Sequence, residues 1–111
     1  MTQIDAFALT LIIEGCAALA VGRALGLQMS ACALAAMLGS MLTHPVLWMV
    51  FHDVHAVVGP LTTPLLEMAV FLAEAPVYRL VAGCRWIDAL LASLLVNAAS
   101  WGAGEVIYAL A

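Results

Sequence analysis

Charged side chains are scarce in this sequence. Only 9% of its 111 residues are Asp, Glu, Lys or Arg, whereas 67% are hydrophobic. A soluble globular domain carries about 25% charged residues, and so short a chain cannot bury this much apolar surface in its own core. The composition therefore excludes an ordinary soluble domain. It predicts one integral membrane domain over residues 1–111, with the lipid bilayer as its principal partner.

Basic residues are the scarcer of the two charged types. Three Lys plus Arg stand against seven Asp plus Glu, so the formal net charge is −4. No basic patch is available for the phosphates of a nucleic acid, and nucleic acid is not an expected partner. The N-terminal residues also lack the Lys or Arg that opens a secretory signal peptide, so we expect the first apolar segment to be retained.

Catalytic and cofactor motifs are missing as well. The sequence has no glycine-rich phosphate loop, no HExxH helix and no C-x-x-C pair. Its cysteines, Cys16, Cys32 and Cys84, lie in or beside apolar runs, and we interpret them as small buried hydrophobic residues. We therefore expect a protein that is not an enzyme. An intramembrane enzyme ranks third, after the transport and accessory-subunit hypotheses given below. No cofactor is indicated beyond a divalent metal ion, considered below.

Four apolar runs are what the sequence has instead. A membrane-spanning helix needs about 20 mostly apolar residues. The runs predict helices over about residues 6–22, 27–51, 63–81 and 86–108, and residues 53–62 form the longest of the short connections. Short connections make consecutive helices antiparallel, so we predict an all-α, up-down-up-down four-helix membrane bundle. Pro45 predicts a kink in the second helix.

The basic residues predict the orientation of these helices. Arg23 lies in the first connection, and Arg79 and Arg85 flank the third. Because basic residues favour the cytoplasmic side, we predict a multi-pass protein of the inner (plasma) membrane of a prokaryote. Both termini and the 53–62 connection would then be periplasmic or extracellular. Small residues along the helices would also permit a homodimer or a place in a larger membrane complex.

Several polar side chains lie inside the apolar runs. A carboxylate within a bilayer is costly and normally faces a partner or a water-filled cavity. Antiparallel threading at about 1.5 Å per residue brings five polar residues to one level in the outer half of the membrane: Glu14, His44, Glu74, Asn97 and Ser100. Glu67 shares a helix face with Glu74, and Tyr78 follows Glu74 by one turn.

We interpret this polar layer as a site that binds or transports a cation or a proton-coupled solute. Carboxylate and imidazole groups suit a divalent metal, for which His44 and Glu74 are candidates and His52 and His55 weaker ones. The alternative is that Glu14 and Glu74 are protonated and hold the helices together by hydrogen bonds. The chain would then be a non-catalytic accessory or assembly subunit of a larger membrane complex.

Three short motifs carry a resemblance to known proteins: Leu42-Thr43-His44-Pro45, Glu67 and Glu74 with Tyr78, and Asn97 followed by Ser100 three residues later. Together they resemble a set of small, uncharacterised prokaryotic four-span membrane proteins. This resemblance implies an architecture and a list of polar positions, but no reaction. The small multidrug resistance exporters also combine four spans with a first-helix carboxyl group. Residues 64–75 lack their glycine- and aromatic-rich third-helix motif, so we do not adopt that family.

Overall fold

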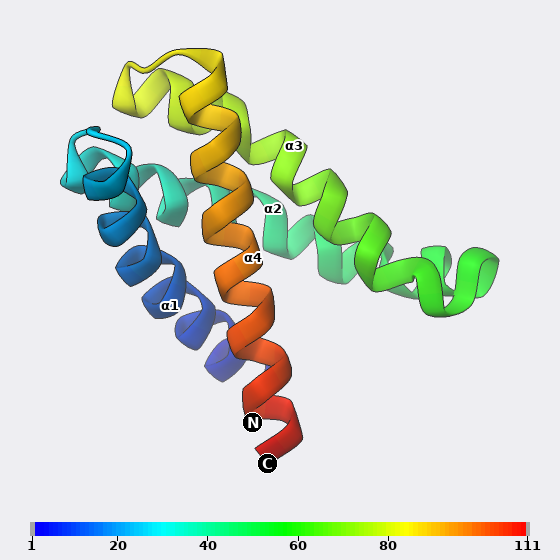
Figure 1. Cartoon of the computed structure of the whole chain (residues 1–111). Coiled ribbons are helices and arrows are strands. Elements are labelled where there is room, and N and C mark those ends of the chain that lie inside the picture. The colour runs from blue at the N-terminus through cyan, green and yellow to red at the C-terminus, as the bar shows by residue number, and fades with distance from the viewer. Residues whose placement is uncertain (1, 111) are drawn as a thin grey trace.

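The structure is a computed structural model that describes residues 2–110, and these residues fold into helices with no strand among them. Four α-helices and one short 3-10 helix follow one another along the chain: α1 (Gln3–Ala24), α2 (Met29–Val58), η1 (Gly59–Leu61), α3 (Thr62–Ala82) and α4 (Trp86–Leu110) (Figure 1). The all-α prediction is confirmed. The bounds of α3 agree with the prediction to within one residue at each end. The other three α-helices differ from their predicted bounds by at least two residues at one end or both.

The largest difference lies at the second connection. Residues 53–62 are not a loop, because α2 continues to Val58 and passes directly into η1 and α3. Met29–Ala82 is thus one helical stretch of 54 residues. A straight helix of that length would measure about 80 Å, whereas the longest dimension of the structure is 40 Å. The stretch therefore folds back at η1 (Figure 1), and the loop prediction was wrong.

Gly59 and Pro60 explain where this bend falls. No glycine or proline occurs between Asp53 and Val58, so nothing stops α2 before Gly59. Gly59 has φ +58°, in the left-handed region that glycine adopts without steric cost. The Thr62 hydroxyl donates to the Gly59 carbonyl over 2.6 Å, and Nδ1 of His55 lies 3.1 Å from the same oxygen. The turn is therefore closed by side chains from both helices.

The helices pack in a ring. Each helix lies against its neighbours in the chain, and α1 also packs against α4, while α1 and α3 do not meet. The ends of α2 and α3 next to η1 extend away from α1 and α4, whereas the opposite ends of the helices converge (Figure 1). α2 and α3 remain helical through Pro45 and Pro76 respectively. Of these two prolines, only Pro45 stood out in the sequence.

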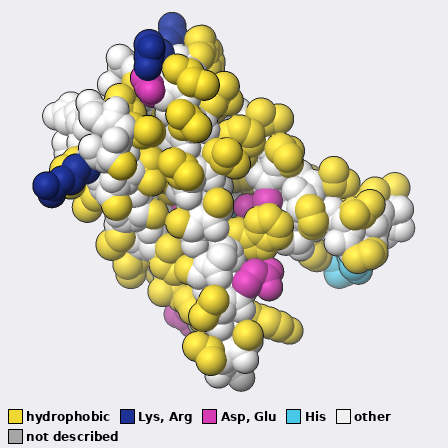
Figure 2. Space-filling view, viewed as in Figure 1, with side chains coloured by type: hydrophobic (Ala, Val, Ile, Leu, Met, Phe, Trp, Pro, Cys, Tyr) yellow, Lys and Arg dark blue, Asp and Glu magenta, His cyan; other side chains and the backbone are white. Residues whose placement is uncertain are grey.

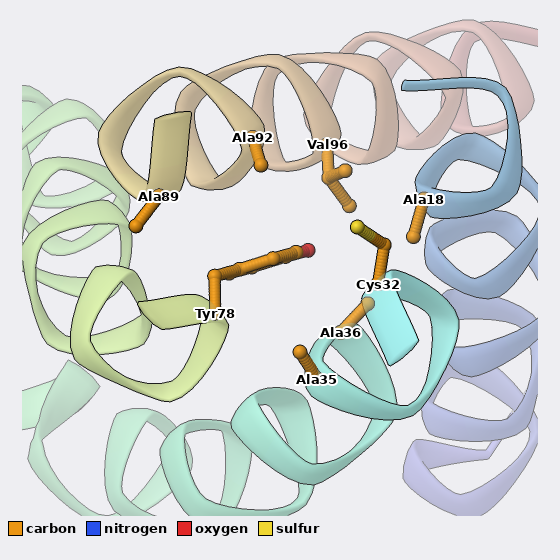
Figure 3. Packing of buried hydrophobic residues seen from close by; sticks show 8 residues of the cluster. All are labelled: Ala18, Cys32, Ala35, Ala36, Tyr78, Ala89, Ala92 and Val96. Atoms are coloured by element: carbon orange, nitrogen blue, oxygen red, sulfur yellow. The ribbon is translucent and has the colours of Figure 1, made fainter. Parts of the chain in front are cut away.

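The buried core lies where the helices converge, and it consists mostly of small side chains. Its members come from all four α-helices (Figure 3): Ala18, Cys32, Ala35, Ala36, Tyr78, Ala89, Ala92 and Val96. Small residues let helix backbones approach closely. Burial of Cys32 agrees with its interpretation as a small hydrophobe, whereas Cys84 is only partly buried and Cys16 is exposed, against expectation.

The outer surface is largely apolar (Figure 2). Val57 and Leu80, for example, are each 83% exposed. Three helical stretches are long and apolar enough to cross a membrane: Ile4–Ala24, Met29–Ala82 and Trp86–Leu110. Such a surface would be unfavourable in water, and it is compatible with a membrane protein.

The arginine side chains lie at the half of the molecule that holds the connections α1–α2 and α3–α4, two at the top of the view and one apart from them at the left (Figure 2). Arg79 lies over the Trp86 ring, 5.0 Å from its centroid, and donates to the Cys84 carbonyl over 3.0 Å. Arg85 donates to Asp88 over 3.1 Å, and this hydrogen bond raises the pKa of the guanidinium group. The positive charge at this end is therefore permanent.

Candidate functional site

A polar pocket of about 240 Å³ lies where α1 and α4 diverge from α2 and α3. Each α-helix contributes one ionisable side chain to its wall: Glu14, His44, Glu67 and Glu105. Ser100 and Trp101 also line it, and no Lys or Arg among the described residues does so. Acidic side chains are visible beside α4, on the side that faces α3 (Figure 2). The structure thus brings together three residues of the predicted layer, Glu14, His44 and Ser100, and adds the candidate residue Glu67.

Glu14 is the residue that α1 contributes to the polar pocket with a charged group. Its side chain is only 1% exposed, although it lines the pocket wall. The Ser40 hydroxyl on α2 donates to its carboxyl group. Ser40 lies one turn before His44, so both residues lie on the same face of α2. The sequence analysis missed Ser40; a serine spaced four residues from a candidate histidine was the available signal.

Glu74 lies outside the polar pocket, in a separate buried network. Its side chain is 0% exposed. The Thr43 hydroxyl donates to one carboxyl oxygen over 2.9 Å, and the Asn97 amide donates to the other over 3.4 Å. Asn97 also donates to the Ser93 carbonyl over 2.8 Å. Glu74 therefore links α3 to both α2 and α4, and the predicted single layer is divided into a pocket and a network.

Tyr78 lies further towards the converging end, inside the core. Its ring is fully buried and extends between α2 and α4 towards Cys32 and Val96 (Figure 3). The hydroxyl oxygen has no hydrogen-bond partner among the described residues. A buried hydroxyl without a partner is unfavourable. Tyr78 is thus placed with the packing residues and apart from the polar pocket, although the sequence analysis listed it with Glu74 as a candidate site residue.

Aromatic rings hold His44 at the edge of the polar pocket. The imidazole centroid lies 5.7 Å from the ring of Phe7 and 6.2 Å from that of Trp48, and these two rings meet edge to face at 5.5 Å. On α4, Trp101 donates from its indole nitrogen to Glu105 over 3.1 Å. His44 and Glu105 therefore both have aromatic neighbours that help to position them. The sequence analysis did not connect these aromatic residues with the site.

The predicted metal ligands are not assembled into a metal site. Among residues 2–110, no three His, Cys, Asp or Glu side chains are close enough together to hold an ion. His52 and His55 lie within α2 and not in a loop, and His55 contacts the Gly59 carbonyl. His44 and Glu74 belong to the pocket and the network respectively. The geometry gives no support to a divalent metal at either pair.

Comparison with known proteins adds no identification. No protein-family model, curated protein or solved structure matches this chain. The resemblance to small four-span membrane proteins, carried by short motifs, therefore stays a prediction.

Proposed function

We propose that the chain is a multi-pass protein of the inner membrane, an antiparallel four-helix bundle that binds a cation in the polar pocket and exchanges it for protons. One observation carries the proposal: three carboxyl groups and an imidazole from four helices line one pocket, and no Lys or Arg of residues 2–110 lies in its wall. The negative charge of a carboxylate inside a membrane is unfavourable unless it is neutralised or paired. A bound proton neutralises the carboxylate, and a bound cation pairs with it.

The dimensions and the surface support the membrane placement. α1 has 22 residues and is about 33 Å long, which matches a hydrocarbon core of about 30 Å. Exposed large hydrophobic side chains occur on all four α-helices. With the arginines of the converging end in the cytoplasm, the polar pocket opens towards the periplasmic or extracellular half of the membrane, and both termini lie on that side.

Proton release on cation binding tests this proposal. The purified full-length protein in nanodiscs is titrated with sodium or tetramethylammonium ions in weakly buffered solution, and the released protons are counted. We expect release from the wild type and a loss of at least half of it in Glu14→Gln and in Glu67→Gln. Asp53→Asn, which removes an exposed acid outside the polar pocket, serves as the control. Equal release from all four proteins would overturn the proposal.

The buried network favours a second role for part of the polar layer. Glu74 is fully buried and bonded to Thr43 and Asn97, which is the arrangement expected of hydrogen bonds that hold membrane helices together. We propose that Glu74 has a structural role and stabilises the packing of the helices whose side chains line the pocket. If the pocket residues also prove structural, the chain fits the alternative of an accessory or assembly subunit in a larger membrane complex.

A further inference from the structure

An apolar groove adjoins the polar pocket along α1 and α4. This α1–α4 groove has a volume of about 380 Å³ and shares three wall residues with the polar pocket: Thr10, Ser100 and Gly104. The rest of its wall is apolar except for the hydroxyl of Tyr108, and comprises Ala6, Leu9, Ile13, Ile107 and Tyr108. A charged compartment and a larger hydrophobic one therefore adjoin at these three residues.

We propose that the ligand of this site is an amphiphile with a cationic head group and an apolar body, which enters from the bilayer between α1 and α4. This inference rests on the proposed function and names the class of cation that the polar pocket takes. The head group would lie beside Glu14 and Glu67, and the apolar body would occupy the α1–α4 groove.

The charges and the aromatic lining select an organic cation. The carboxyl groups of Glu14, Glu67 and Glu105 would repel an anionic head group, and no Lys or Arg among the described residues lines the pocket. Trp101 lines it as well, and the face of an indole ring attracts an ammonium group. The absence of three convergent ligands among residues 2–110 also suits an ammonium ion, which needs no coordination shell.

Gly104 leaves free space where the two compartments adjoin. Gly104 belongs to both walls, and a Cβ atom added to it would meet nothing within 4 Å. A second groove, between α3 and α4, shares Glu67 and Trp101 with the polar pocket but has a volume of only about 150 Å³. The α1–α4 groove is therefore the better fit for an apolar body.

Three probes and one pair of variants test the inference. Dodecyltrimethylammonium, tetramethylammonium and dodecanoate are each titrated into the purified full-length protein in a sugar-headgroup detergent. We expect dodecyltrimethylammonium to bind about tenfold more tightly than either of the others. Ala6→Trp fills the α1–α4 groove. It should lower the affinity for dodecyltrimethylammonium to that for tetramethylammonium and leave the affinity for tetramethylammonium unchanged. Ala8→Trp, also at an exposed position of α1 but outside the groove, should change neither.

The outcomes separate the two proposals. Equal binding of dodecyltrimethylammonium by both tryptophan variants would overturn the groove while leaving the cation pocket intact. Tight binding of dodecanoate would overturn the selection for a cation. If neither cation binds the wild type, the proposed function fails as well. Gly104→Leu, with Gly102→Leu as control, is the second variant pair, and it should abolish binding of both cations because position 104 lies in both walls.

Discussion

Gly39 on α2 lies directly against the Glu74 side chain on α3. A Cβ atom at position 39 would lie 3.0 Å from Cγ and 3.1 Å from Cδ of Glu74. Few side chains pack so closely, so alanine at position 39 would require the Glu74 side chain, which accepts a hydrogen bond from Thr43, to shift by a few tenths of an ångström. The buried network thus depends on a glycine that has no polar group of its own.

Gly39→Ala should therefore destabilise the protein by about 1–3 kcal/mol, because an overpacked core must shift. The measurement is thermal or denaturant unfolding of the purified protein in detergent. Gly102→Ala is the matched control, since a Cβ there meets no other atom within 4 Å and alanine favours the helix by up to about 1 kcal/mol. Equal stability of the two variants would contradict the tight contact.

Tyr78→Phe should leave the stability unchanged or raise it by about 1–3 kcal/mol, because it removes a buried hydroxyl without a partner. The same unfolding assay measures the change. Tyr108→Phe, at a position that is 85% exposed, should have no effect. A clear loss of stability in Tyr78→Phe alone would show that the hydroxyl is hydrogen-bonded after all.

Glu74→Gln should separate the network from the polar pocket. Cation-linked proton release should remain close to that of the wild type, because Glu74 does not line the pocket. Unfolding should show a loss of about 1–3 kcal/mol, since the amide replaces one acceptor oxygen of the network by a donor. Glu14→Gln should show stronger loss of proton release. The division into pocket and network is refuted if Glu74→Gln abolishes release and Glu14→Gln does not.

Membrane orientation can be tested with a reporter that is active only outside the cytoplasm. Alkaline phosphatase fused after Leu110 should be active, because the end of α4 lies opposite the arginine-rich end (Figures 1 and 2). The same enzyme fused after Gly83, in the connection between α3 and α4, should be inactive. The reverse pattern of activities would invert the proposed topology, and activity at both positions would exclude it.

The helices could largely be predicted because apolar runs bounded by glycine and arginine are strong local signals. α3 and α4 begin within one residue of their predicted starts. The second connection could not be predicted in the same way. The charges and histidines of residues 52–55 suggested a loop, but polar residues can remain in a helix until a breaker such as Gly59 ends it.

Residue counting along antiparallel helices predicted Glu14, His44 and Ser100 at one level, and these three residues line the polar pocket. The rise per residue is a property of any α-helix, so depth can be estimated without a structure. Counting could not show which neighbour each side chain meets, because that depends on the rotation and spacing of packed helices. The pairing of Glu14 with Ser40 and of Glu74 with Thr43 belongs to this second kind of information.

The sequence by itself determined that the chain is helical and apolar, that its arginines lie at or beside two helix connections, and that most of its acids lie within the apolar segments. Those properties follow from composition and from local hydrogen bonding. Only the tertiary structure decided that Glu14 lines a pocket, that Glu74 belongs to a separate buried network, and that an apolar groove adjoins the pocket. The physical reason is close packing: a glycine at position 39 and small residues in the core set the distances between helices, and those distances decide which polar groups meet.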